Sequence, residues 1–157
     1  MKIDLHSHSY YSDGVLSPSE LIKLANQAGC DLFSLTDHDT TDGIVEAQLE
    51  ADKLNLNLVN GVEISALWRN MTIHILGLGV DINNDVLQTG LEHNQKLRKE
   101  RAEKIALGLW RSGIKDALEK TQSFSKTEML TRTHFAQMLI SEGYCKDMKA
   151  VFRRYLT

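Results

Sequence analysis

The chain has 157 residues, of which 42% are hydrophobic and 25% charged, and its formal net charge is −3. These values are ordinary for a globular protein, and the negative balance argues against binding of long DNA. No stretch approaches the roughly 20 apolar residues of a membrane span, and charged residues interrupt the N-terminus where a signal peptide would be apolar. Cys30 and Cys145 fit no paired metal spacing and indicate reduced thiols. We therefore expect a cytoplasmic protein without a membrane partner.

The first half of the chain alternates between strand-like and helix-like segments. Strands are expected over 2–6, 31–36, 56–64 and 72–78, with helices over 18–28 and 42–53 and a loop around 68–70. Ser17 and Glu20 form a capping box around Pro18. The inward positions are expected at Leu21, Leu24, Ala25 and Ala28 in the first helix and Ile44, Ala47 and Ala51 in the second. This order predicts α/β architecture with four parallel strands, which is fewer than the roughly eight of a closed barrel. The sheet is then either a small open one or the N-terminal part of a larger enzyme.

The second half changes to helices without strands. A charged helix is expected over 91–110, with Leu97, Ala102, Ile105 and Leu109 on one side and a break at Gly113. A second helix carries Phe135, Met138 and Leu139 and ends at Gly143, and a last one covers 147–156. We therefore expect an α/β domain over 1–90 and a helical subdomain over 91–157.

Side chains suited to chemistry follow or interrupt each predicted strand. His6 and His8 are two residues apart, which puts both rings on one face of a strand, and Asp13 lies in the next loop. The other candidates are Asp37, His38, Glu63 and His74. Because functional groups of parallel sheets collect at the carboxyl ends of strands, we expect these side chains to meet. Imidazoles with carboxylates and no thiolate suit Zn²⁺, Mn²⁺ or Fe²⁺ better than Ca²⁺. A carboxylate such as Glu63 can bridge two ions about 3.5–4 Å apart, an arrangement that serves in-line displacement at phosphorus.

Several of these residues also have a simpler structural interpretation. The alternatives are a hydrogen-bonded core histidine at His74, turn or cap residues at Asp37 and Asp39, a turn at Asp13-Gly14 and a solvated histidine at His93. Glu63 fits such an interpretation poorly, because an unpaired buried carboxylate is costly. The repeated placement at strand ends favours the metal centre.

The motifs resemble those of the PHP (polymerase and histidinol phosphatase) family. The matching segments are Asp-Leu-His-Ser-His at 4–8, Ser-Asp-Gly at 12–14, Thr-Asp-His-Asp at 36–39, Gly-Val-Glu-Ile-Ser at 61–65 and Ile-His-Ile-Leu-Gly at 73–77. Two helical segments, 131–136 and 151–156, resemble the inserted helical subdomain of one branch. Its members are 3′,5′-nucleoside bisphosphate phosphatases that also act as 5′→3′ exoribonucleases on short RNA. The resemblance implies a distorted β/α (TIM-like) barrel and hydrolysis of nucleotide or short RNA substrates by metal-activated water.

Carried onto this sequence, the resemblance assigns six metal ligands: His6, His8, Asp13, His38, Glu63 and His74. His6 and His8 would share one ion with Glu63, Glu63 would bridge to the ion of His74, and Asp13 with His38 would hold a third. The implied cofactors are two or three divalent ions in the complete enzyme, Mn²⁺ foremost, with Zn²⁺, Fe²⁺ or Mg²⁺ as alternatives. Asp37 is a candidate catalytic residue that orients His38 or substrate. Arg132 and His134, expected off the buried face of their helix, are candidates for phosphate contact. The alternative is a solvated surface residue at Arg132 and a polar helix-start residue at His134.

The sequence also departs from the family pattern. It contains neither the later Ala-His-Pro segment nor the Asp-x-His pair near the C-terminus that carry further ligands in the family. We therefore expect an incomplete chain, completed by a C-terminal segment or a second chain, with little turnover by itself. The alternatives to a nucleotide phosphoesterase are a non-catalytic metal- or nucleotide-binding remnant and a histidinol-phosphatase-like enzyme.

Overall fold

The computed structural model describes residues 1–69 and 71–156, which divide into two compact units, 1–95 and 96–157. The first unit contains β1 (Ile3–Asp4), α1 (Pro18–Gln27), β2 (Leu32–Leu35), α2 (Ile44–Leu54), β3 (Asn57–Trp68) and β4 (Met71–Leu78). The helix α3 (Asp85–Arg111) begins in the first unit and runs without interruption into the second. The division into domains over 1–90 and 91–157 stays a prediction.

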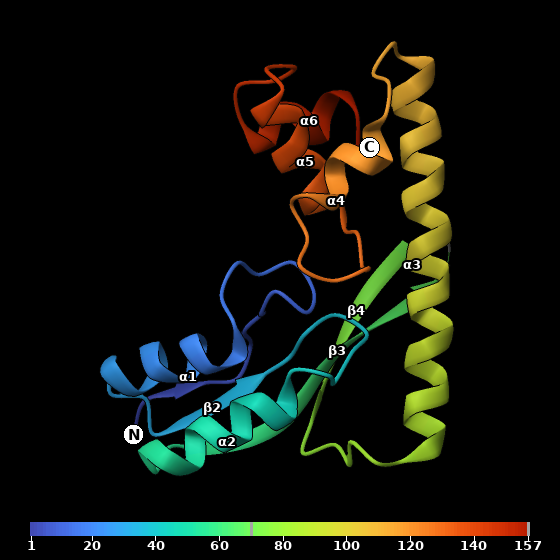
Figure 1. Ribbon diagram of the computed structural model, residues 1–157. Coiled ribbons are helices and arrows are strands. Elements are labelled where there is room, and N and C mark those ends of the chain that lie inside the picture. The colour runs from blue at the N-terminus through green and yellow to red at the C-terminus, as the bar shows by residue number, and fades with distance from the viewer. Residues whose placement is uncertain (70, 157) are drawn as a thin grey trace. The chain divides into compact units, whose positions relative to one another are not determined.

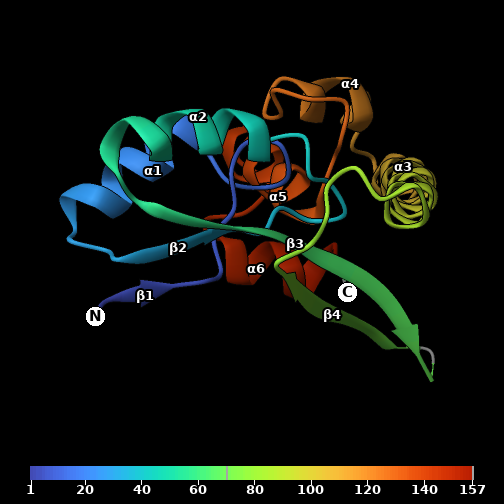
Figure 2. The same cartoon turned by 90° about the horizontal axis from the view of Figure 1, so that it is seen from below.

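The first unit is built on a four-stranded sheet in the order β1-β2-β3-β4 (Figure 1). β1, β2 and β3 pair in parallel, as the alternating segments predicted, and α1 and α2 lie together on one face of these strands (Figure 2). Between that face and the helices lies a core of Ile22, Ala25, Cys30, Phe33, Leu35, Ile44, Ala47, Ala51 and Leu56. Such a mixed α/β half-barrel matches the expected fold class.

The prediction of a fourth parallel strand was wrong, because β3 and β4 form an antiparallel hairpin. β3 is longer than expected and ends at Trp68, and β4 begins at Met71. A parallel connection needs a crossover of about a dozen residues or more, so the chain can only return antiparallel here. Of the loop predicted around 68–70, residue 70 lies outside the described residues.

The capping box of α1 is confirmed: the Ser17 hydroxyl accepts from the Glu20 backbone N–H, and the Glu20 carboxylate accepts from that of Ser17. The predicted inward stripe was partly wrong, since Ile22 is fully buried while Leu24 is half exposed. In α2 the predicted core positions Ile44, Ala47 and Ala51 are all buried.

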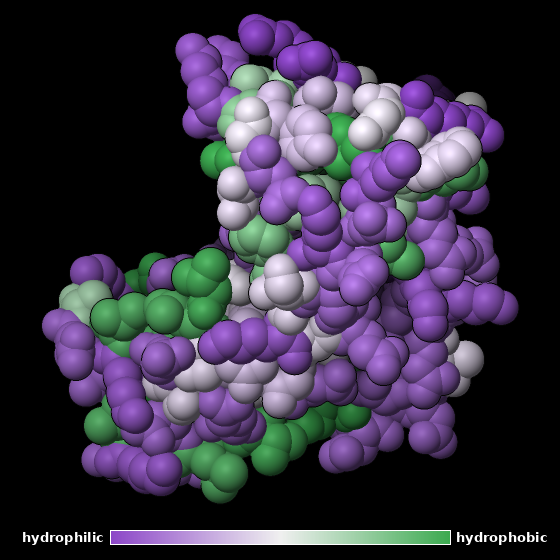
Figure 3. Space-filling view, turned by 45° about the horizontal axis from the view of Figure 1, so that its top comes forward, coloured by the Kyte–Doolittle hydropathy of each residue, from purple (hydrophilic) through white to green (hydrophobic). Residues whose placement is uncertain are grey.

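The second unit contains the rest of α3 and the helices α4 (Ala117–Gln122), α5 (Arg132–Ser141) and α6 (Met148–Arg154). Its core consists of Ala102, Leu109, Ile114, Ala117, Leu130, Phe135, Ala136, Met138, Leu139, Val151 and Leu156. α4 was not predicted, and Leu97, expected on the apolar side of α3, is 44% exposed. Hydrophilic side chains cover the side of the surface that carries α3 (Figure 3). Among the described residues no helix is both long and apolar enough to cross a bilayer.

Candidate metal centre

In the first unit, backbone pairing brings the segments that follow β1 and β2 beside the middle of β3. β1 is followed by His6 and His8, and β2 by Asp37 and His38. Beyond β2, His38 pairs with Glu63 of β3, and the Glu63 N–H donates to the Asp37 carbonyl at 3.1 Å. Glu63 thus lies at the place where the polar segments after β1 and β2 converge.

Three ligand atoms form a tight triangle at this point. The Nε2 atoms of His6 and His8 are 3.0 Å apart, and each lies 3.0 Å from Oε2 of Glu63. Glu63 is buried, whereas the His6 side chain is half exposed. β1 is shorter than predicted and ends before His6, so loop backbone rather than strand pleat turns the two rings toward each other.

Hydrogen bonds alone cannot account for all three of these close contacts. Each ring nitrogen carries at most one proton, which lies in the ring plane and points at one partner, and a carboxylate carries none. At least one of the three contacts is therefore not a hydrogen bond. Ligand atoms that share one ion at about 2.1 Å lie roughly 3.0–3.4 Å apart, which the triangle matches. The donor set and its spacing fit a divalent cation.

The other candidates extend the triangle into a cluster. The Nδ1 atoms of His38 and His74 lie 3.4 and 3.6 Å from the Glu63 carboxylate, and Oδ1 of Asp13 lies 3.8 Å from His8 and 3.9 Å from His38. Three groups result, each with ligand atoms within 4.8 Å of one another: His6–His8–Glu63, His8–Asp13–His38 and His38–Glu63–His74. With neutral imidazoles, the six side chains carry two negative charges, which favours divalent cations over anions. All six predicted ligands thus lie together, and their role in binding metal stays a prediction.

Asp37 lies beside this cluster and holds a loop. Its carboxylate accepts from the Ser9 N–H at 2.7 Å and from the Ser9 and Ser12 hydroxyls, both at 2.6 Å. Asp37 is 2% exposed and both serines are fully buried. Burial raises the pKa of Asp37, while the hydrogen bonds from Ser12 and Ser9 act in the opposite direction. Asp37 therefore supports the segment that presents His8, and its catalytic role stays a prediction.

Ser12 connects Asp37 to the first histidine pair. Its Oγ lies 3.4 Å from Nδ1 of His8, and a hydroxyl has only one proton, which Ser12 donates to Asp37. The His8 contact then needs a proton on Nδ1, and this tautomer leaves the Nε2 lone pair directed into the triangle. The sequence reasoning missed Ser9 and Ser12, although hydroxyls flanking His8 in the segment before Asp13 were a signal.

Asp39 is a second missed support. It is fully buried with φ of 52°, and its Oδ1 accepts from the Ser65 N–H at 2.7 Å and the Asn94 amide at 2.8 Å. The helix predicted from residue 42 begins two residues later, because α2 starts at Ile44 after Gly43. The fixed Asp39 links β3 to the first turns of α3 within the first unit.

A glycine and a tyrosine shape the loop that carries His8. A Cβ at Gly14 would overlap the carbonyl oxygen of His8, so the close return of this loop requires glycine. The Tyr10 hydroxyl donates to Glu46 at 3.4 Å, and burial together with the Glu46 charge raises the pKa of Tyr10.

The two candidates for phosphate contact differ in their surroundings in the second unit. Arg132 is exposed, with its guanidinium 5.9 Å from the centre of the Phe152 ring. His134 is 3% exposed, and its Nδ1 accepts from the Thr131 N–H at 3.2 Å. The expectation that His134 lies off the buried face was therefore wrong, because its ring completes the capping box of α5. Its contact with substrate stays a prediction.

The chain that carries this cluster is similar to known proteins over nearly its whole length. Residues 4–156 match the family described as PHP domain. This chain belongs to the PHP domain family. The PHP chain is 42% identical over 156 residues to a 3′,5′-nucleoside bisphosphate phosphatase of Chromobacterium violaceum. The matched region covers 99% of this chain and 55% of that protein. It is also 41% identical over 155 residues to the 5′-3′ exoribonuclease Rnm of Escherichia coli, a match that covers 98% of this chain and 53% of that protein.

Solved structures show the same fold as the PHP chain. An amidohydrolase from Chromobacterium violaceum with bound sulfate superposes with a TM-score of 0.95 at 42% identity, over all of this chain and 56% of that one. A protein from Bifidobacterium adolescentis superposes over the same shares with a TM-score of 0.84 at 23% identity. The chain spans about half the length of the curated relatives it matches.

Proposed function

We propose that this PHP chain binds divalent metal through the Glu63 cluster and is the metal-binding part of a phosphoesterase acting on nucleoside 3′,5′-bisphosphates or the 5′ ends of short RNA. The observation that carries the proposal is the triangle of His6, His8 and Glu63, whose ligand atoms lie 3.0 Å from one another. The names of the Chromobacterium and Escherichia relatives support the substrate class.

In this proposal the residues of the chain have distinct tasks. His6 and His8 hold one ion with Glu63, Glu63 extends its second oxygen toward His74, and His38 with Asp13 offers a further position. Divalent ions held there would supply an activated water and neutralise charge on the phosphoryl oxygens. Asp37 and Ser12 keep His8 in the tautomer that directs Nε2 to the cluster. Imidazole with carboxylate ligands suits Zn²⁺, Mn²⁺ or Fe²⁺, and of these Mn²⁺ is the ion that we propose.

His8→Ala tests the proposal through metal content. Elemental analysis of the purified wild-type chain should find at least one Mn²⁺, Zn²⁺ or Fe²⁺ ion. His8→Ala should lose this ion or bind it roughly 100-fold more weakly, because loss of a ligand costs at least as much affinity as loss of a residue that only supports a ligand. The matched control is His93→Ala, because His93 is exposed on α3 and belongs to none of the three groups. Equal metal content in all three proteins would contradict the proposal.

Arg132→Ala tests the assignment of Arg132 to phosphate binding. In a completed, active enzyme the change should raise KM for a nucleoside 3′,5′-bisphosphate about ten-fold. KM for an aryl phosphate should stay within about two-fold, because the proposed guanidinium contact is to the second phosphate, which an aryl phosphate lacks. Arg111→Ala, which removes another exposed arginine, is the charge-matched control. An equal loss on both substrates would instead indicate damage to folding or to the metal centre.

A further inference from the structure

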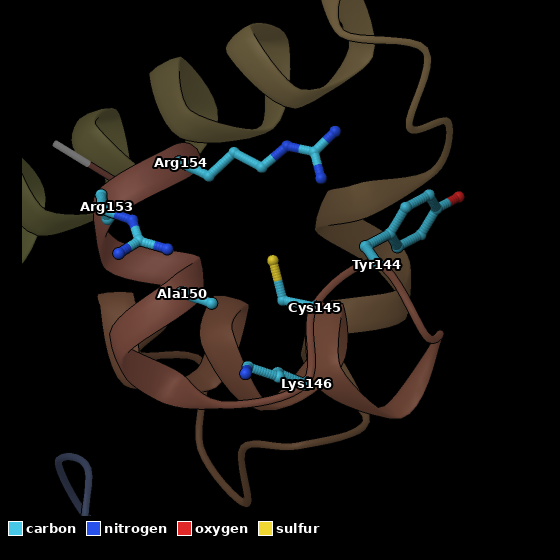
Figure 4. Close-up of a pocket in the computed structure, with 6 residues that line it drawn as sticks. All are labelled: Tyr144, Cys145, Lys146, Ala150, Arg153 and Arg154. Atoms are coloured by element: carbon cyan, nitrogen blue, oxygen red, sulfur yellow. The ribbon is translucent and has the colours of Figure 1, made fainter.

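The second unit contains a hollow beside α6 that the metal chemistry does not use. It has a volume of about 480 Å³ and is lined by Tyr144, Cys145, Lys146, Ala150, Arg153 and Arg154 (Figure 4). Ligand sites commonly measure about 300–1,000 Å³, so the space accommodates a nucleotide-sized group as well as a single phosphate. In Figure 4 the sulfur of Cys145 lies between the ring of Tyr144 and the side chains of α6.

The lining of this hollow is positively charged in a chain of net negative charge. Lys146, Arg153 and Arg154 contribute three cations and no carboxylate lines the space, whereas the whole chain carries −3. Within residues 1–69 and 71–156 none of the three forms an ion pair. The neighbouring Asp147 accepts from the Ala150 N–H at 2.8 Å as the N-cap of α6, so its carboxylate serves the helix. The hollow therefore suits an anion that brings its own negative charges.

Aromatic rings accompany these cations. Tyr144 at the hollow is 37% exposed, and the guanidinium of Arg154 lies 5.0 Å from the centre of the Tyr155 ring. Basic grooves with exposed aromatic rings bind single-stranded nucleic acid, because the cations follow the phosphates while bases stack on the rings. A small anion such as free phosphate would need neither the ring nor the volume.

We propose that this hollow binds the phosphate backbone of single-stranded RNA, with Lys146, Arg153 and Arg154 on the phosphates and Tyr144 as a stacking surface. The inference rests on the proposed function and deepens it, because it makes a short RNA strand, rather than a mononucleotide alone, the ligand of this protein. Binding here depends on the second unit's own residues and therefore persists without metal.

The experiment measures binding of a fluorescently labelled short RNA to the chain in EDTA, by anisotropy at several salt concentrations. The double variant Arg153→Ala/Arg154→Ala should weaken binding about ten-fold or more, and the slope of log affinity against log salt should fall by about 1.4, because each lost contact to a single strand contributes about 0.7. Both arginines are exposed, so the variant should keep its fold, which circular dichroism checks. Lys149→Ala is the matched control, since Lys149 is an exposed cation on α6 outside the lining.

Cys145 provides a second readout in the unmodified protein. It is the more accessible of the two thiols, because Cys30 is buried and its Sγ lies 3.1 Å from the Leu32 carbonyl, to which it can donate its one proton. Saturating RNA should slow maleimide labelling of Cys145, followed by peptide mass spectrometry, at least about five-fold, since the occupied hollow blocks access.

Three results would overturn the inference: an equal loss of affinity in Lys149→Ala, labelling of Cys145 that RNA does not slow, or competition by inorganic polyphosphate as strong as that by RNA. Failure of the proposed function is read separately, in the metal content of His8→Ala. A negative result for RNA binding therefore leaves the metal-binding test valid, and a negative result for metal binding leaves the RNA test valid.

Discussion

Glu63→Gln is expected to reduce metal affinity by at least about 100-fold, more than the 10–100-fold that loss of an outer-shell partner costs. The substitution keeps the shape of the side chain but replaces a ligand oxygen by an amide and removes a negative charge. Glu63 belongs to two of the three candidate groups, and its carboxylate lies within 3.0–3.6 Å of nitrogens of His6, His8, His38 and His74. A single change at Glu63 therefore weakens two positions for an ion at once.

Titration calorimetry with Mn²⁺ and thermal melts check this expectation. At a metal concentration of 100 times Kd, binding stabilises the native wild type by about 2.7 kcal/mol, and this gain should disappear in Glu63→Gln. Glu50→Gln is the matched control, because Glu50 is also a buried carboxylate but pairs with Lys23 and Lys53 instead of histidines. Metal binding by Glu63→Gln with wild-type affinity would remove Glu63 from the centre.

Asp37→Ala is expected to lower the free energy of unfolding by about 3 kcal/mol, because buried donors lose a charged acceptor. The Ser9 N–H and the Ser9 and Ser12 hydroxyls all donate to Asp37, and both serines are fully buried. For a chain of this size the melting temperature should fall by roughly 6–12 °C. Urea unfolding followed by circular dichroism measures the change.

The same variant also tests whether Asp37 supports the metal centre. Because Asp37 holds Ser12, and Ser12 contacts His8, metal affinity should fall about 10–100-fold even where the variant is fully folded. Asp52→Ala, at an exposed helix position, should stay within about 0.5 kcal/mol of wild type and bind metal normally. Wild-type stability together with wild-type metal affinity in Asp37→Ala would refute the supporting role.

Local sequence signals predicted the elements of the first unit well. The capping residues around Pro18 fixed the start of α1, and the apolar spacing of Ile44, Ala47 and Ala51 identified the buried face of α2. Both signals depend on neighbours within one or two helical turns, so they need no knowledge of the rest of the chain. The direction of β4 was missed because the short connection after Trp68 was not weighed against the length that a parallel crossover needs.

The sequence by itself determined which side chains could form the metal centre, because His6, His8, Asp13, His38, Glu63 and His74 follow or interrupt strand segments and strand ends meet at one edge. Only the tertiary structure decided how they are held. Asp37 is separated from Ser9 and Ser12 by more than 20 residues in sequence, and Asp39 from Asn94 by 55. These hydrogen bonds form only when distant segments pack and exclude water, and packing likewise buried His134 in the cap of α5. Residue type and spacing specify the candidate ligands, whereas long-range packing decides which residues support them and how exposed they are.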